Sequence, residues 1–286
     1  MLRSGQLDWN LIAPVQQATL GKSPAIALLT VPTAVVAGLV LNVQHTPLDD
    51  VRVRRALAMS IDRQAISKKI TLGRYPVTDM LQPKFSWAYD PAVKLPPFDP
   101  AGADALLDKA GWKRTTGAWR AKNGKTFSLV YVQFPESMTG VRVATAVQAQ
   151  LRARGISVEV KSVSNAQLFL PSSRGGTLAG GAFDMAYVPF TMGSDPDDSS
   201  VLACHGPSNY MRYCNPRVDS LEKLALSSPS QQDRKRLYAS IARTVAADVP
   251  IIYLFNADYI YAYRATLHGF GPNAFLPTWN AAEWRR

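Results

Sequence analysis

The 286-residue sequence predicts an α/β fold in which helices flank a mixed β-sheet. Three observations carry this prediction: long apolar runs rich in β-branched residues, helical segments with clear capping residues, and a strand–helix–strand unit in the middle of the chain. Because 47% of the residues are hydrophobic and only 19% are charged, the chain can bury a sizeable core, and its length allows one large domain or two.

The apolar stretch from Ala25 to Asn42 contains no charged side chain. It is shorter than the roughly 20 apolar residues that a membrane-spanning helix needs, and Pro32 lies near its centre. We therefore expect two buried strands, IALLTV and AVVAGLVLN, one on each side of Pro32. A signal peptide is not expected, because the start of the chain is polar and contains Asp8.

Capping residues mark the first two predicted helices. Either Asp49 or Asp50 can accept hydrogen bonds from the free N–H groups at the start of an amphipathic helix. Asp99 is a natural N-cap for the second helix, Pro100 fits its first position, and Gly111 closes it in a left-handed conformation.

The strand–helix–strand unit comes next. Residues 125–134 and 155–163 alternate like strands, and residues 137–154 have helical spacing, so we expect two parallel strands joined by a helix. The rest of the chain predicts a strand over 182–190, helices over 215–228 and 230–249, and an apolar return strand over 249–265.

The charge balance raises the question of a nucleic-acid partner. The formal net charge is +11 and the sequence pI is about 9.7. However, the basic residues are scattered, and their densest groups, at 52–55 and 234–236, are not interleaved with stacking aromatics. A solvated basic surface is the favoured interpretation, and no nucleic-acid partner is expected.

Signals for catalysis are poor. His45, His205 and His268 are widely separated, and none lies in a zinc-binding spacing. The sequence contains no nucleophile elbow and no glycine-rich phosphate-binding loop. We therefore expect no enzyme activity, no metal site and no cofactor.

The two cysteines, Cys204 and Cys214, bracket the short loop CHGPSNYMRYC. A metal site would have to recruit His205, which gives only three nearby ligands without the C-x-x-C spacing of zinc sites. A disulfide is favoured over two free thiols, and closing so small a loop would stabilise the fold by roughly 2 to 3 kcal/mol.

Five segments, in order along the chain, carry a resemblance to a known family. They are LRSGQLDW, LNVQHTPLDDVRVRRALAMSIDRQAI, FDPAGADALLDKAGW, SDPDDSSVLACHGPSNYMRYCNPRVDSLEKLA and DRKRLYASIARTVAADVPIIYLFN. Together they resemble the family 5 extracellular solute-binding proteins of ABC transporters, which bind dipeptides, oligopeptides or nickel. The resemblance implies a substrate-binding component that takes up peptides or a related small solute in the periplasm and delivers it to an ABC permease in the inner membrane. A similar cysteine pair in some members supports the disulfide.

The resemblance also implies how the chain is divided. Members are about twice this long, so we expect a type II periplasmic-binding-protein lobe plus part of a second lobe. Residues 1–40 would be the C-terminal strands of a truncated first lobe, 41–252 the second, ligand-closing lobe, and 253–286 the return to the first. An upstream chain that supplies the missing lobe is a further expected partner. We also expect apolar strand surface from Ile26 to Leu41 to be left unpaired.

The resemblance places the solute site at the strand before the DPD turn. In peptide-binding relatives the ligand lies as an added strand, so backbone groups of Val188 and Phe190 are candidate partners; an inner strand with no ligand role carries equal weight. Met192 stands where those relatives have the aspartate that pairs with the ligand ammonium. Asp195 lies nearby as a candidate ligand residue, although it is also placed to cap the next helix. Because Met192 has no carboxylate to pair with an ammonium, we expect a ligand other than a free peptide, such as a sugar, an opine-like compound or a blocked peptide.

Three function classes therefore stay open. The leading one is the substrate-binding component of an importer. The second is an inactive fragment of such a protein, because much of the first lobe is missing. The third is a basic nucleic-acid-binding protein.

Overall fold

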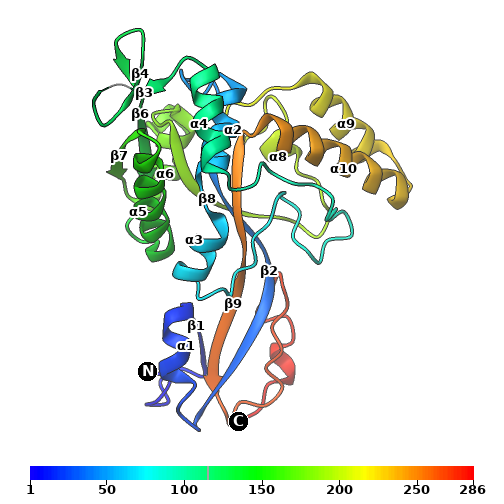
Figure 1. The fold of residues 1–286 in the computed structure, drawn as a ribbon. Coiled ribbons are helices and arrows are strands. Elements are labelled where there is room, and N and C mark those ends of the chain that lie inside the picture. The colour runs from blue at the N-terminus through cyan, green and yellow to red at the C-terminus, as the bar shows by residue number, and fades with distance from the viewer. Residues whose placement is uncertain (115) are drawn as a thin grey trace.

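A mixed six-stranded sheet organises the molecule. The computed structural model describes residues 1–114 and 116–286, and Figure 1 shows their arrangement. In spatial order the strands are β1 (Trp9–Ile12), β9 (Ile251–Arg264), β2 (Ile26–Leu41), β8 (Met185–Thr191), β6 (Ser128–Gln133) and β7 (Ser157–Ser162). Neighbours from β1 to β8 are antiparallel, whereas β6 is parallel to both β8 and β7. The mixed α/β fold and the predicted parallel strand–helix–strand unit are confirmed.

Helices cover the wide end of this sheet. The longer ones are α2 (Val51–Ser60), α3 (Arg63–Ile70), α4 (Pro100–Lys109), α5 (Met138–Ala153), α9 (Pro216–Ser227) and α10 (Gln231–Asp248). Shorter elements are α1 (Pro14–Leu20), α6 (Asn165–Phe169), α7 (Thr177–Gly180), α8 (Ser199–Leu202), η1 (Ser172–Arg174), η2 (Ala281–Glu283) and a small sheet of β3 (Lys113–Arg114), β4 (Arg120–Lys122) and β5 (Lys125–Thr126). Asp50, not Asp49, caps α2 by accepting from the Arg52 N–H, and Asp99 caps α4 as predicted.

The apolar stretch around Pro32 forms one strand, so the prediction of two strands is wrong. β2 runs unbroken from Ile26 to Leu41 and pairs with β9 on both sides of Pro32, with a shift of register between Pro32 and Val35. Thr33 lies within this irregularity, where its hydroxyl donates to the Ala257 carbonyl and accepts from the Val35 N–H. A bulge tolerates proline because a ladder hydrogen bond is already interrupted there. Among the described residues, no helix is long and apolar enough to cross a membrane.

The core divides where β2 and β9 leave the wide end of the sheet. Above this point, one large apolar cluster joins both strands, from Ala34 to Leu41 and from Ile251 to Phe255, to the helices. Below it, two small clusters cover the two faces of the β1–β9–β2 sheet. Figure 1 shows β2 and β9 descending side by side from the lobe to this lower piece, where both termini lie.

The lobe assignment 1–40, 41–252 and 253–286 stays a prediction. The change of core falls inside both long strands, between Val31 and Ala34 in β2 and between Phe255 and Tyr259 in β9. The expectation that all of β2 is unpaired is wrong for its upper half, because Val35–Leu41 has β9 on one side and β8 on the other. Only its lower half lies at an edge of the described sheet.

Candidate functional site

The strand β8 has an open side at its carboxyl end. Its parallel pairing with β6 covers only Met185 and Ala186, whereas its antiparallel pairing with β2 continues to Thr191. From Tyr187 onward, the side of β8 away from β2 therefore has no strand partner among the residues that the structure describes. Ligands of open α/β sheets typically bind at the carboxyl ends of strands, which is where this opening lies.

The ladder between β2 and β8 fixes which backbone groups face the opening. The Met192 N–H donates to the Ala34 carbonyl at 2.8 Å, and the register runs from there without a shift. Because hydrogen-bonded pairs alternate along an antiparallel ladder, the N–H and C=O groups of Phe190 and Val188 point toward β2. These backbone groups are therefore taken up by the pairing with β2, and the expectation that they bind a ligand is wrong.

The backbone groups that face the opening belong to the alternate residues Tyr187, Pro189 and Thr191. Proline has no N–H to donate, so the middle position offers only its carbonyl. An extended ligand beside β8 would therefore find an incomplete row of main-chain partners, and its affinity would depend more on the side chains nearby.

Those side chains form a pocket of about 250 Å³ at the end of β8. Val188, Phe190 and Met192 line it, although each is less than a tenth exposed. Phe169 and Tyr210 line it too, with ring centroids 6.2 Å apart. Three of the four predicted ligand residues are thus brought together with an aromatic pair beside them, and polar residues complete the lining: Asp197, Ser200 and Ser208.

Met192 leaves the pocket without a carboxylate at its own position. Its side chain is 5% exposed and lines the cavity. An ammonium group placed against this thioether would lose water without gaining an anionic partner from position 192, which is costly. Asp197 also lines the pocket, but its carboxylate accepts from the Ser199 N–H. The pocket therefore suits an uncharged or apolar group at this point.

Asp195 lies outside the lining of this pocket. Its carboxylate pairs with Arg234 of α10 at 2.5 Å, and that hydrogen bond lowers the pKa of Asp195. The Arg234 guanidinium also lies over the rings of Trp87 and Tyr238, at 5.3 and 5.6 Å from their centroids. Asp195 thus ties the DPD turn to α10, while Asp197 accepts from the Ser199 N–H at the start of α8.

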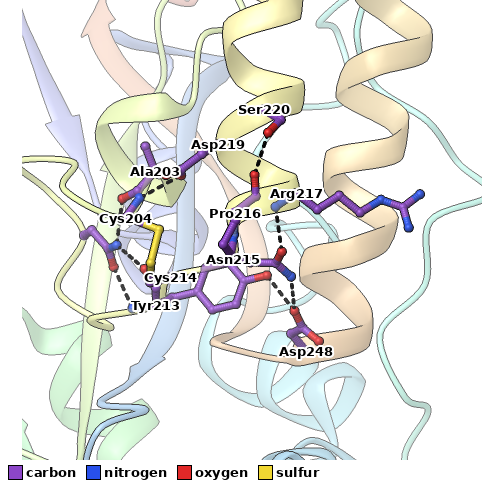
Figure 2. Close-up of a disulfide and its surroundings, with 11 residues drawn as sticks. Ala203, Cys204, Tyr213, Cys214, Asn215, Pro216, Arg217, Asp219, Ser220 and Asp248 are labelled. Atoms are coloured by element: carbon purple, nitrogen blue, oxygen red, sulfur yellow. Dashed lines mark hydrogen bonds between the residues drawn. A yellow bond between two sulfur atoms is a disulfide. The ribbon is translucent and has the colours of Figure 1, made fainter.

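The predicted disulfide joins Cys204 and Cys214. Figure 2 shows the bond beside the start of α9, where the Cys204 N–H donates to Asp219. Within the loop, the Asn209 side-chain amide donates to two carbonyls and accepts from the Tyr213 N–H. The loop also carries Ser208 and Tyr210, which line the pocket. The disulfide therefore fixes one wall of the candidate site.

Sequence reasoning missed that wall. Tyr210 lies between the two cysteines, and its place in a loop closed by a disulfide is the feature of the sequence that could have marked it as a site residue. Phe169 comes from the short helix α6, whose place beside β8 depends on the fold and has no local signal. Within the described residues, no group of three or more histidine, cysteine or acidic side chains could hold a metal ion.

The comparisons with known proteins agree on one family. The model of the bacterial extracellular solute-binding proteins, family 5 (middle region), matches residues 1–211. The chain is 27% identical to the probable ABC transporter periplasmic-binding protein SapA of Escherichia coli strain K12, over 90% of this chain and 46% of the relative. It is 27% identical to the glutathione-binding protein GsiB of Shigella flexneri, over 94% of this chain and 52% of the relative.

Solved structures show the same fold. The oligopeptide-binding protein AppA of Bacillus subtilis, solved with a nonapeptide, has a TM-score of 0.89 at 23% identity and covers 99% of this chain and 56% of its own. NikZ of Campylobacter jejuni, solved with Ni(L-His), has a TM-score of 0.88 at 22% identity, over 100% of this chain and 58% of its own. The fold is that of type II periplasmic binding proteins, and the chain spans about half the length of these relatives.

Proposed function

Since the chain belongs to the family 5 bacterial extracellular solute-binding proteins, we propose that it provides the ligand-closing lobe of a substrate-binding component of an ABC importer. The observation that carries this proposal is the pocket at the open side of β8, because it lies where an extended solute can approach the sheet. The solute is a peptide or a related small molecule, and the protein works in the periplasm beside an inner-membrane permease.

The proposed contacts come mainly from side chains. Val188, Phe190 and Met192 form an apolar floor, and Tyr210 supplies an aromatic wall. Asp195 contributes by holding the turn through Arg234. Since Met192 offers no anion to a ligand ammonium, a blocked peptide, a sugar or an opine-like compound fits this floor better than a free peptide end.

The proposal requires a second lobe. Binding proteins of this kind enclose their solute between two lobes, and closing excludes water from the contacts. The chain spans about half the length of its relatives, so the opposite face would come from an upstream segment or chain. The Cys204–Cys214 disulfide supports a periplasmic location, because such bonds persist in oxidising compartments.

The test compares this chain alone with the same chain preceded by a first lobe from a family 5 relative. Isothermal titration with free and N-acetylated di- and tripeptides should show no measurable binding to the chain alone, because a single open face keeps only part of the contacts. The two-lobe protein should bind, and it should favour the acetylated peptides.

Met192→Asp should shift that preference toward free peptides, by about tenfold or more, because it restores an anion to the floor. Met138→Asp is the matched control, since Met138 is 63% exposed at the start of α5 and does not line the pocket. Micromolar binding of free dipeptides by the chain alone would contradict the proposal, and a two-lobe protein that binds nothing would support an inactive fragment instead.

A further inference from the structure

A second pocket lies at the hinge, where β2 and β9 leave the lobe. Its volume is about 330 Å³, at the lower end of the range for small-molecule sites. Thr33 of β2, Asn256 and Asp258 of β9, and Lys84 and Phe85 of the loop after α3 are among the residues that line it. It shares no lining residue with the pocket at β8.

Asn256 is the unusual member of this pocket. Its side chain lines the cavity and the residue is only 5% exposed. Its backbone N–H donates to the Pro76 carbonyl at 3.0 Å, but neither Nδ2 nor Oδ1 of its side chain has a hydrogen-bond partner among the described residues. An unsatisfied buried polar group costs about 1 to 3 kcal/mol, and native structures contain few of them. A polar ligand inside the pocket would supply the hydrogen bonds that this amide lacks.

Two opposite charges flank this amide. Asp258 lies two residues further along β9, on the same face of the strand as Asn256. Its carboxyl is partly buried, which raises its pKa, while the charge of Lys84 acts in the opposite direction. Lys84 is thus near enough to influence Asp258, yet among the described residues no ion pair within 4.0 Å joins them. The pocket offers separate places for an anion and a cation.

We propose that this hinge pocket binds a small zwitterion of the amino-acid class. The ligand ammonium would donate to the Asp258 carboxylate and to Asn256 Oδ1, and its carboxylate would accept from Lys84 and from Asn256 Nδ2. The amide serves both ends because it carries an acceptor and a donor. Phe85 and the neighbouring prolines supply an apolar rim for an aliphatic side chain.

The pocket also joins three separate segments of the chain. Asn256 and Asp258 belong to β9, Thr33 belongs to the irregular part of β2, and Lys84 and Phe85 belong to a loop that is tied to β9 at Val77 and Phe255. A zwitterion bound here would connect the loop of the lobe to the two strands that lead to the lower piece. All of these residues lie on the present chain, so binding does not require the other lobe.

The test uses ¹H–¹⁵N spectra of the full chain at neutral pH, with glycine and L-alanine as probes. Both should shift the side-chain NH₂ signals of Asn256 at millimolar concentrations. Glycinamide, N-acetylglycine and acetamide, which lack one or both charges, should bind about tenfold more weakly. Equal shifts with acetamide and glycine, or no shift of the Asn256 signals with any probe, would overturn the proposal.

Three variants sharpen this test. Asp258→Asn and Lys84→Gln should each weaken glycine binding about tenfold or more. Asn256→Leu should abolish binding without lowering the melting temperature, because it removes an unsatisfied buried amide. Asn10→Leu, at an exposed position of β1, is the matched control.

A destabilised Asn256→Leu protein, together with unchanged glycine binding by Asp258→Asn and Lys84→Gln, would show that Asn256 serves the fold alone, and would refute the site. If Asn256→Leu does not fold, the two charge variants decide the question. Peptide titration of the two-lobe protein and its Met192→Asp variant reports on the β8 pocket separately, so failure of one proposal is distinguishable from failure of the other.

Discussion

The lobe above the hinge and the three-stranded piece below it share the same two long strands, but the surroundings of those strands differ. In the lobe, the upper half of β2 has strands on both sides, and Val36 to Leu41 are almost completely buried. In the lower piece, β9 is the one strand beside β2 in the part of the chain that the structure describes, and Thr30 and Pro32 are exposed. One strand thus contains a core segment and an edge segment, so the stability of each half depends on its neighbours more than on its own sequence.

The largest expected difference between the two regions is in their response to loss of a leucine. Leu39→Ala should lower the free energy of unfolding by about 2 to 5 kcal/mol, because Leu39 is fully buried in the lobe. The matched variant Leu28→Ala, in the lower half of the same strand, should cost about 1 kcal/mol, because Leu28 is only partly buried. Urea denaturation measures both. Equal losses would show that the lower piece is as tightly packed as the lobe.

The disulfide should have the next largest effect, and it should act on the lobe alone. A Cys204→Ala and Cys214→Ala double variant should lose roughly 2 to 3 kcal/mol of stability, because the unfolded chain is no longer constrained by the short loop. Unfolding followed at the lobe's Trp112 would report this loss. Intact-mass measurement without reductant should find the native pair linked, and two alkylatable thiols in protein taken from the periplasm would count against the assignment.

The packing of helices in the lobe also buries an acidic side chain. Glu222 of α9 is 2% exposed, and burial, together with the neighbouring Asp198 carboxyl, raises the pKa of Glu222 from 4.5 to about 11. The folded state therefore keeps this proton while the unfolded state loses it above about pH 4.5. The stability that Glu222 supplies is complete below that pH and declines as the pH rises toward 11.

Replacing the acid with its neutral isostere removes this dependence. Glu222→Gln should be more stable than the native protein at pH 8, by about 1 to 3 kcal/mol, and the advantage should vanish at acid pH. Glu159→Gln, at an exposed position of β7, is the control and should show neither effect. Thermal unfolding at several pH values provides the measurement, and a Glu222→Gln protein that is less stable at pH 8 would refute the assigned protonation.

The smallest expected effect on stability is at the open edge of the lower piece. Thr30→Lys should change the free energy of unfolding by less than about 0.5 kcal/mol. It should nevertheless reduce self-association in light scattering, because an edge lysine opposes strand pairing between molecules. Thr145→Lys, on the exposed face of α5, should leave association unchanged. Native protein that is already monomeric at high concentration would remove the reason for this prediction.

Local signals predicted the parts of the fold that depend on local chemistry. Asp50 and Asp99 marked helix starts because a cap acts on the backbone only a few residues away. Pro32 was misleading because the partner strand, which accommodates the bulge, lies at the other end of the sequence. The site shows the same limit. Met192 could be singled out from its position before the DPD turn, whereas the direction of the Val188 backbone depends on pairing with β2, and nothing near Asn256 marks its amide as unsatisfied.

The pairing of β2 with β9 has a consequence for how the chain reaches this structure. The Thr33 hydroxyl bonds to the Ala257 carbonyl, 224 residues later in the sequence. Closing so long a loop costs entropy, and folds dominated by distant contacts form slowly. During synthesis, the apolar strand Ile26–Leu41 is made long before β9 and must wait for it. The nascent chain therefore has to be kept from aggregating until β9 has been made.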